Sequence, residues 1–178
     1  IYGFDNIKAT LPSGSVLQGT QGENQTFIDK IRQALSSIGL CETVSFSFTH
    51  PSIFDKLNIP ADSELRRAVP IMNPLTDEYP LVRTTLLSSI FENVTRNLSR
   101  KNEDIQLFEV APVFMPKELP VTEQPLQTLK LAGAIIGRRD VVGWNQQNEQ
   151  VDFYDAKGVV EELLAQLAIG KYTVEAGE

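Results

Sequence analysis

The side chains best suited to act as a nucleophile or a general base are the single cysteine and the single histidine, Cys41 and His50. A catalytic histidine needs a carboxylate that orients its ring, but His50 precedes a proline in THPSIF, where turn formation is the commoner role. Cys41 follows a predicted helix, where a lone cysteine usually behaves as a small buried hydrophobe. We interpret both residues as structural. One cysteine also excludes an internal disulfide bond, which suits a reducing cytoplasm.

Acidic residues lie close together in sequence at three places, where they could bind a metal or share a proton. These pairs are Asp77 with Glu78, Asp152 with Asp155, and Glu161 with Glu162. Neighbouring side chains on a helix diverge by about 100°, so the last pair cannot converge on one ion, and the second pair is better placed to cap a helix. LPSGSVLQGTQG lacks the lysine of a phosphate-binding loop. The residue types therefore predict no catalytic, cofactor-binding or metal-binding site.

The net charge of −7, from 16 basic and 23 acidic residues, opposes binding to a phosphate backbone. The basic clusters are short: Arg96, Arg100 and Lys101, then Arg138 and Arg139. An RNA-contact module that uses the first cluster remains an alternative. No apolar run approaches the ~20 residues of a membrane span. We expect a soluble, cytoplasmic protein without membrane contact.

Hydrophobic spacing predicts the helices and strands that hold these residues. Apolar residues three and four apart predict an amphipathic helix over 24–38, capped by Asn24 and ended by Gly39. ETVSFSFTHP then alternates apolar and hydroxyl residues, which predicts a strand over 43–48 with its apolar face buried. A second amphipathic helix is predicted over 84–101. Its apolar stripe comprises Leu86, Leu87, Ile90, Phe91, Val94 and Leu98.

Two buried strands are predicted in the second half. IQLFEVAPVFMPK forms the first, and Pro112 limits its pairing to one edge; TLKLAGAIIG forms the second. A helix capped by Asp152 or Asp155 and stopped by Gly170 follows, and the last eight residues begin another strand. Helices and strands mix without strict βαβ alternation, so we predict an α+β fold with a largely antiparallel sheet flanked by helices.

Three stretches resemble the beta subunit of bacterial-type phenylalanyl-tRNA synthetase, in the same order and at natural spacing. They are IYGFDNIKATLP, then RRAVPIMNPLTDEYPLVRTTLLSSIFENVTRNLSRK with LFEVAPVF, and finally VDFYDAKGVVEELL. By this resemblance, residues 1–22 are the tail of a preceding domain and a linker of Gly-, Ser- and Pro-rich composition. Residues 23–178 are the catalytic-like core, with the class II synthetase fold, truncated at its C-terminal end.

The resemblance also implies that this core is a degenerate copy of an active domain. Class II synthetases carry a strand that ends in a Phe-Arg-x-Glu motif, whose arginine grips the ATP α-phosphate. On that pattern Phe114 supplies the aromatic residue, but Met115 replaces the arginine and Lys117 replaces the glutamate. A thioether cannot make the bidentate contact that a guanidinium makes with a phosphate. We expect no catalytic residue and no bound ATP or magnesium in this segment.

The role implied is that of a structural core in an α2β2 phenylalanine-tRNA ligase. Within it, the alpha subunit would be the direct partner, and ATP, magnesium and tRNA would be used by the whole complex. The segment alone would not be an enzyme, although a divergent ATP-dependent adenylating domain remains an alternative. The interface candidates are Phe27, Ile31, Leu35, Asn73, Pro74, Leu75 and Arg83.

Overall fold

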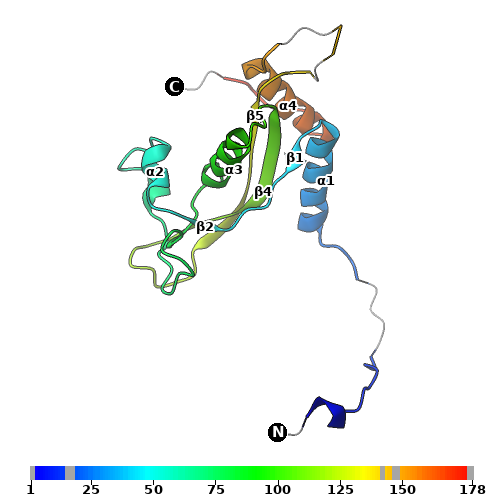
Figure 1. The fold of residues 1–178 in the computed structure, drawn as a ribbon, viewed down its shortest axis with the longest axis vertical. Helices are drawn as coiled ribbons and strands as arrows, with labels where there is room; N and C mark the ends of the chain where they lie inside the picture. Colours follow the sequence, from blue (N-terminus) through cyan, green and yellow to red (C-terminus); the bar gives the residue numbers. More distant parts are fainter. Residues whose placement is uncertain (1–2, 15–18, 141–142, 146–148, 176–178) are drawn as a thin grey trace.

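The computed structural model describes residues 3–14, 19–140, 143–145 and 149–175. It has an α+β fold, with helices packed on a mixed sheet (Figure 1). The strands are β1 (Cys41–Glu42), β2 (Phe48–Thr49), β3 (Leu81–Val82), β4 (Ile105–Met115) and β5 (Leu126–Ile136). The helices are α1 (Glu23–Ser37), α2 (Ile53–Lys56), α3 (Leu87–Ser99) and α4 (Phe153–Gln166), with short 3-10 helices at Phe4–Asn6 and Glu64–Arg66.

The main sheet has the strand order β1-β4-β5. β4 and β5 run antiparallel along their whole length, from the pair Ile105 and Ile136 to the pair Met115 and Leu126. Both strands were predicted, within a largely antiparallel sheet. The prediction that Pro112 limits β4 to one paired edge is wrong, because β4 lies between β1 and β5. β1, however, pairs with β4 in parallel, so the sheet is mixed rather than purely antiparallel. β2 and β3 form a separate antiparallel pair.

The two faces of β4 carry two different hydrophobic cores, because successive residues of a strand point to opposite sides of a sheet. Phe108 and Val110 pack with buried residues of α1 and α4. Ile105 and Leu107 pack with buried residues of α3. Figure 1 accordingly shows α1 and α4 on one side of the long strands and α3 on the other. The sheet therefore separates an α1–α4 side from an α3 side.

α1 confirms the helix predicted over 24–38, with a shift at its start. The N-cap is Gly22 rather than Asn24. At the other end, Gly39 has a φ of 104°, a conformation that glycine adopts without steric cost and that commonly ends a helix. The amide of Leu40 donates to the carbonyl of Leu35 across this turn. The chain therefore turns directly from α1 into β1.

α4 begins with the capping that the sequence predicted. The side chain of Asp152 accepts the N–H of Asp155, and the carboxylate of Asp155 accepts the N–H of Asp152. The helix stops earlier than predicted: Ala168, not Gly170, has a positive φ, of 58°. The predicted C-terminal strand is absent from residues 171–175, which is its described part.

One predicted strand is less buried than expected, and one predicted helix is shorter than expected. β5 was expected to be buried, but it lies at the edge of the sheet with only β4 beside it among the described residues. Its exposed apolar side chains are Leu126, Leu129 and Leu131. α3 is shorter than the predicted 84–101 and buries one narrow line of its stripe against the sheet. The remaining apolar residues of that stripe are exposed: Leu87, Phe91 and Leu98.

Residues 3–14 form an arm that is exposed throughout and extends away from the body in Figure 1. They belong to the predicted tail and linker, of which residues 1–2 and 15–18 lie outside the described part of the chain. In the described part, every helix is too short or too polar to cross a membrane.

Candidate functional site

The end of β4 holds the three positions where the resemblance placed a degenerate nucleotide-binding motif. Phe114 and Met115 are half-buried, and Lys117 is exposed and forms a 2.8 Å ion pair with Glu123. A thioether and a paired ammonium do not supply the planar fork with which a guanidinium binds phosphate. The main chain of Arg83 reaches this site, because its carbonyl accepts the N–H of Phe114 at 3.0 Å. Its guanidinium points away from this site, toward Glu109.

The side chain of Arg83 is part of a buried polar network. Its guanidinium forms a 2.8 Å ion pair with Glu109, and both residues are 1% exposed. It also donates to the carbonyls of Pro112 at 3.1 Å and Phe46 at 3.4 Å. The second carboxylate oxygen of Glu109 accepts the hydroxyl of Ser89 at 2.7 Å. A buried ion pair must keep its partners, so this guanidinium cannot serve a phosphate group.

The segment 43–47 runs along this network and turns its polar residues inward. The N–H of Ser45 donates to the carboxylate of Glu109 at 3.3 Å. The amide of Asn93, on α3, donates to the hydroxyls of Thr43 at 3.0 Å and Ser45 at 3.1 Å. Hydroxyl groups can satisfy a buried carboxylate and amide, whereas methyl and phenyl groups cannot. The polar side of the segment is therefore its inner side.

The apolar residues of the same segment point outward. Val44 is 90% exposed and Phe46 is 82% exposed, while Phe48 is partly exposed at the start of β2. The predicted alternation is present, but the predicted strand over 43–48 is not, since residues 43–47 lie between β1 and β2 and only Phe48 is in a strand. The prediction that the apolar face of this stretch is buried is also wrong. Cys41, just before it, is also exposed rather than buried. This segment presents apolar surface that its own fold does not cover.

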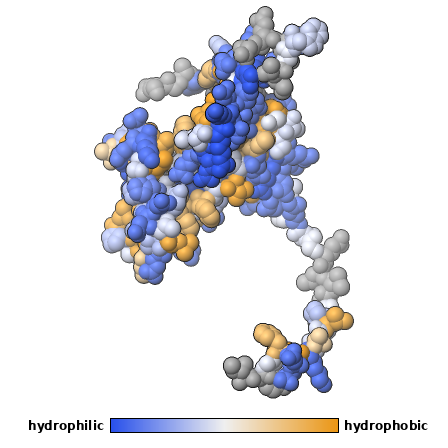
Figure 2. All heavy atoms as spheres, in the orientation of Figure 1, coloured by the Kyte–Doolittle hydropathy of each residue, from blue (hydrophilic) through white to orange (hydrophobic). Residues whose placement is uncertain are grey.

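The loop between Ile71 and Pro80, closed by a hydrogen bond from the N–H of Ile71 to the carbonyl of Pro80, also carries exposed apolar residues. Met72 is 92% exposed and Leu75 is 95% exposed. Asn73 is exposed and Pro74 is partly buried between them, so this predicted interface loop does lie at the surface. Figure 2 shows hydrophobic side chains at the end of the body where β2 and the neighbouring loops lie.

The remaining interface candidates lie in other settings. Phe27 is about half exposed on α1, but Ile31 and Leu35 are buried in the α1–α4 core. Arg83 is buried in the network. These last three are buried within this chain, and their role at an interface stays a prediction.

Val44 and Phe46 were not among the residues predicted to lie at an interface. The acid in the middle of an apolar strand, Glu109 in LFEVAPVF, was the signal that could have found them. A buried carboxylate requires polar neighbours, and the nearest hydroxyl-rich stretch is Thr43 to Ser47.

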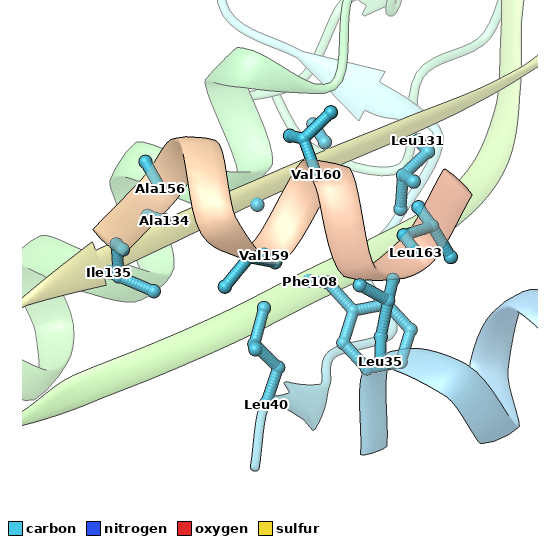
Figure 3. Close-up of a pocket in the computed structure, with 12 residues that line it drawn as sticks. Leu35, Leu40, Phe108, Leu131, Ala134, Ile135, Ala156, Val159, Val160 and Leu163 are labelled. Carbon is cyan, nitrogen blue, oxygen red and sulfur yellow. The ribbon is translucent and has the colours of Figure 1, made fainter. Parts of the chain in front are cut away.

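An apolar cleft of about 390 Å³ lies between α4 and the sheet (Figure 3). Leu35 and Leu40 line it from one side, Phe108 from β4, and Val159 and Leu163 from α4. Its lining contains only apolar side chains and a glycine. Such a cleft has no group that could transfer a proton, attack a substrate or bind a metal.

The single histidine, His50, lies outside the buried network and takes part in a local turn. The ring of His50 lies 2.7 Å from the hydroxyl of Ser52 and accepts the N–H of the same residue at 3.1 Å, which fits the turn role predicted for it. Among the described residues, His, Cys, Asp and Glu form no cluster that could hold a metal.

The two arginines of the second basic cluster, Arg138 and Arg139, form ion pairs with carboxylates. Hydrogen bonds from the Arg138 side chain, and then from its backbone N–H, lower the pKa of Asp104. Hydrogen bonds from Arg139 lower the pKa of Asp155, with a second contribution from the backbone of Asp152. These ion pairs neutralise the positive charge that the sequence placed there.

The sequence matches one protein family over most of its length. A family model described as the phenylalanyl tRNA synthetase beta chain CLM domain matches residues 7–178. The phenylalanine-tRNA ligase beta subunit of Syntrophotalea carbinolica is 39% identical over 173 residues, covering 97% of this chain and 21% of the relative. The corresponding subunit of Geobacter metallireducens is 38% identical over 170 residues, covering 96% of this chain and 21% of the relative.

Solved structures show a shared fold. The crystal structure of pyrrolysyl-tRNA synthetase from Desulfitobacterium hafniense matches with a TM-score of 0.60 at 15% identity, covering 83% of this chain and 48% of that chain. The chain spans about a fifth of the length of its curated relatives. Because the family model covers nearly the whole sequence, the chain belongs to the phenylalanyl-tRNA synthetase beta chain family, in its CLM domain.

Proposed function

We propose that this chain is a non-catalytic core of a phenylalanine-tRNA ligase beta subunit, and that its work is assembly with the alpha subunit. Membership of the phenylalanyl-tRNA synthetase beta chain family supports a role in that ligase complex. The end of β4 supports the absence of chemistry, since Met115 stands at the position of a phosphate-binding arginine and Arg83 is engaged by Glu109. In this proposal the domain has the class II synthetase fold and binds neither ATP nor magnesium itself.

One observation carries the assembly role: the buried network turns Val44 and Phe46 outward. Exposed apolar groups of this size mark surfaces that another protein covers. We group them with the exposed residues Phe48, Met72 and Leu75 and call this set the apolar docking face. The core of an obligate interface is rich in such aromatic and aliphatic residues. We place the alpha subunit on this face, within a cytoplasmic α2β2 heterotetramer that binds tRNA as a whole.

The test uses the full-length beta subunit expressed with its alpha subunit. Phe46→Ser should abolish or strongly reduce co-purification of the alpha subunit, because a hydroxyl replaces an exposed phenyl ring at the centre of the face. Phe153→Ser is the matched control, since Phe153 is 71% exposed but lies on α4, on the other side of the sheet. It should leave assembly unchanged.

Two results would contradict the proposal. One is normal assembly with Val44→Ser/Phe46→Ser, which would remove the docking face from the interface. The other is calorimetric binding of ATP and magnesium to this chain alone, lost in Lys117→Ala, which would favour the adenylating alternative.

A further inference from the structure

The docking face is hollowed where the segment 44–48 meets α3. We propose that this hollow, which we call the anchor pocket, receives one bulky apolar side chain of the alpha subunit. In the alpha subunit, an acidic and a basic residue flank that side chain. The inference rests on the proposed function, because it specifies how the alpha subunit engages the docking face.

The anchor pocket has a volume of about 310 Å³ and walls of mixed character. Phe46, Phe48 and Tyr79 supply aromatic walls, and Ser88 and Ser89 of α3 are buried at its base. Pockets for drug-sized ligands and cofactors start at about 300 Å³, so this one is at the lower limit of that range. This volume is large enough for one bulky side chain with its flanking atoms.

Two opposite charges, Glu92 and Arg96, also line the anchor pocket. They lie four residues apart on α3, in the order that normally favours an ion pair on a helix. Neither takes part in an ion pair within the described part of the chain. Both charges are therefore available to a partner, and they define its chemistry: an acidic group toward Arg96 and a basic group toward Glu92.

The walls are fixed before any partner arrives. The carboxylate of Glu109 accepts hydrogen bonds from the backbone N–H of Ser45 and from the hydroxyl of Ser89, and both residues line the pocket. The amide of Asn93 joins α3 to the same segment through Ser45. Preorganised pockets of this kind lower the entropic cost of binding, and anchor residues concentrate in them. The buried network thus shapes the pocket that the docking face offers.

The test measures the apparent dissociation constant of the assembled ligase, from mass photometry on dilution, for charge variants of the full-length beta subunit. Arg96→Glu and Glu92→Arg should each raise it by about tenfold or more, as loss of an interface hot spot does. The neutral variant Arg96→Gln should have a smaller effect in the same direction. Arg100→Glu, one turn further along and outside the pocket, is the control and should change it little.

Circular dichroism of each variant establishes that the fold is intact, which the exposure of Glu92 and Arg96 favours. If Phe46→Ser disrupts assembly while Arg96→Glu and Glu92→Arg do not, the anchor pocket is wrong and the docking face stands. If all of these variants assemble normally, both fail. An equal effect of Arg100→Glu and Arg96→Glu would show a general charge effect and would also overturn the pocket.

Discussion

Two neighbouring amphipathic segments fold with opposite sides inward. In α1, Ile31 and Leu35 are buried and the charged residues face solvent. In the segment 43–47, the hydroxyl residues face the interior, and Val44 and Phe46 are almost fully exposed. Both segments show a clear period in the sequence. Their difference lies in what they pack against.

α1 packs on Phe108, an apolar residue on one face of β4. The segment 43–47 packs near Glu109, the next residue, which points to the other face. Burial of a charged group without polar partners costs more free energy than burial of a few methyl or phenyl groups would gain. A hydrophobic period therefore shows that two sides differ, and the neighbour decides which side is buried.

The largest effect is expected from breaking the buried ion pair. Arg83→Met should lower the free energy of unfolding by about 3 to 5 kcal/mol, because it leaves the carboxylate of Glu109 buried without its guanidinium. Urea denaturation of this chain measures the change. The segment 43–47 should also lose protection in hydrogen exchange, since Phe46 loses a partner of its carbonyl.

The double variant Arg83→Met/Glu109→Leu separates charge from packing. Replacing both partners with apolar residues of similar size is often close to neutral, so it should recover most of the lost stability. If the double variant is as unstable as Arg83→Met, the ion pair is not what organises this region.

The second prediction concerns the buried apolar side of α1. Leu35→Ala should lower the free energy of unfolding by about 3 kcal/mol, because it removes a buried side chain and enlarges a cavity. Leu35 is 3% exposed and borders the apolar cleft in Figure 3. Urea denaturation again gives the value. A loss below about 1 kcal/mol would mean that the cleft collapses onto the vacated space.

Much of this fold could be predicted from the sequence, for identifiable reasons. α1 and β4 have long, consistent apolar patterns, and Asp152 and Asp155 have the spacing of a capping box. Such local signals act through neighbouring residues in the chain. They are strong enough to locate these elements without tertiary information.

The partners of each element could not be predicted in the same way. Arg83 and Glu109 are 26 residues apart, and nothing local shows that they meet. The exposure of β5 depends on which strand lies beside it, and the inverted segment 43–47 depends on Glu109. The apolar docking face depends on these long-range contacts. Of its residues, only Leu75 was among the interface residues predicted from the sequence.

The exposed half of the segment should contribute little to the stability of this chain. Phe46→Ser should change the free energy of unfolding by no more than about 0.5 kcal/mol, as surface substitutions away from special features do. The contrast with Leu35→Ala, a smaller loss of side-chain volume with a larger effect, sharpens the distinction between the two segments. Thermal and urea unfolding of the two variants side by side provide the measurement. A destabilisation by Phe46→Ser that matches that of Leu35→Ala would show that the ring is packed within the chain.

The smallest effect concerns the same pairing of arginine and carboxylate at the surface. Asp104 accepts hydrogen bonds from Nε of Arg138 at 3.0 and 3.1 Å, and these bonds lower its pKa below the ordinary value of 3.8. Since the folded-state pKa is the lower one, the pair stabilises the fold above pH 3.8 and loses this contribution as the pH falls through the folded-state value. In Asp104→Asn, the free energy of unfolding should depend less on pH between about pH 5 and 3. The stability of the variant should approach that of the parent chain at the acidic end of this range.

Added salt should weaken the difference in stability between Asp104→Asn and the parent chain at neutral pH, because exposed charges are screened. It should leave the effect of Arg83→Met almost unchanged. Equal salt sensitivity of the two variants would mean that burial does not distinguish the two ion pairs.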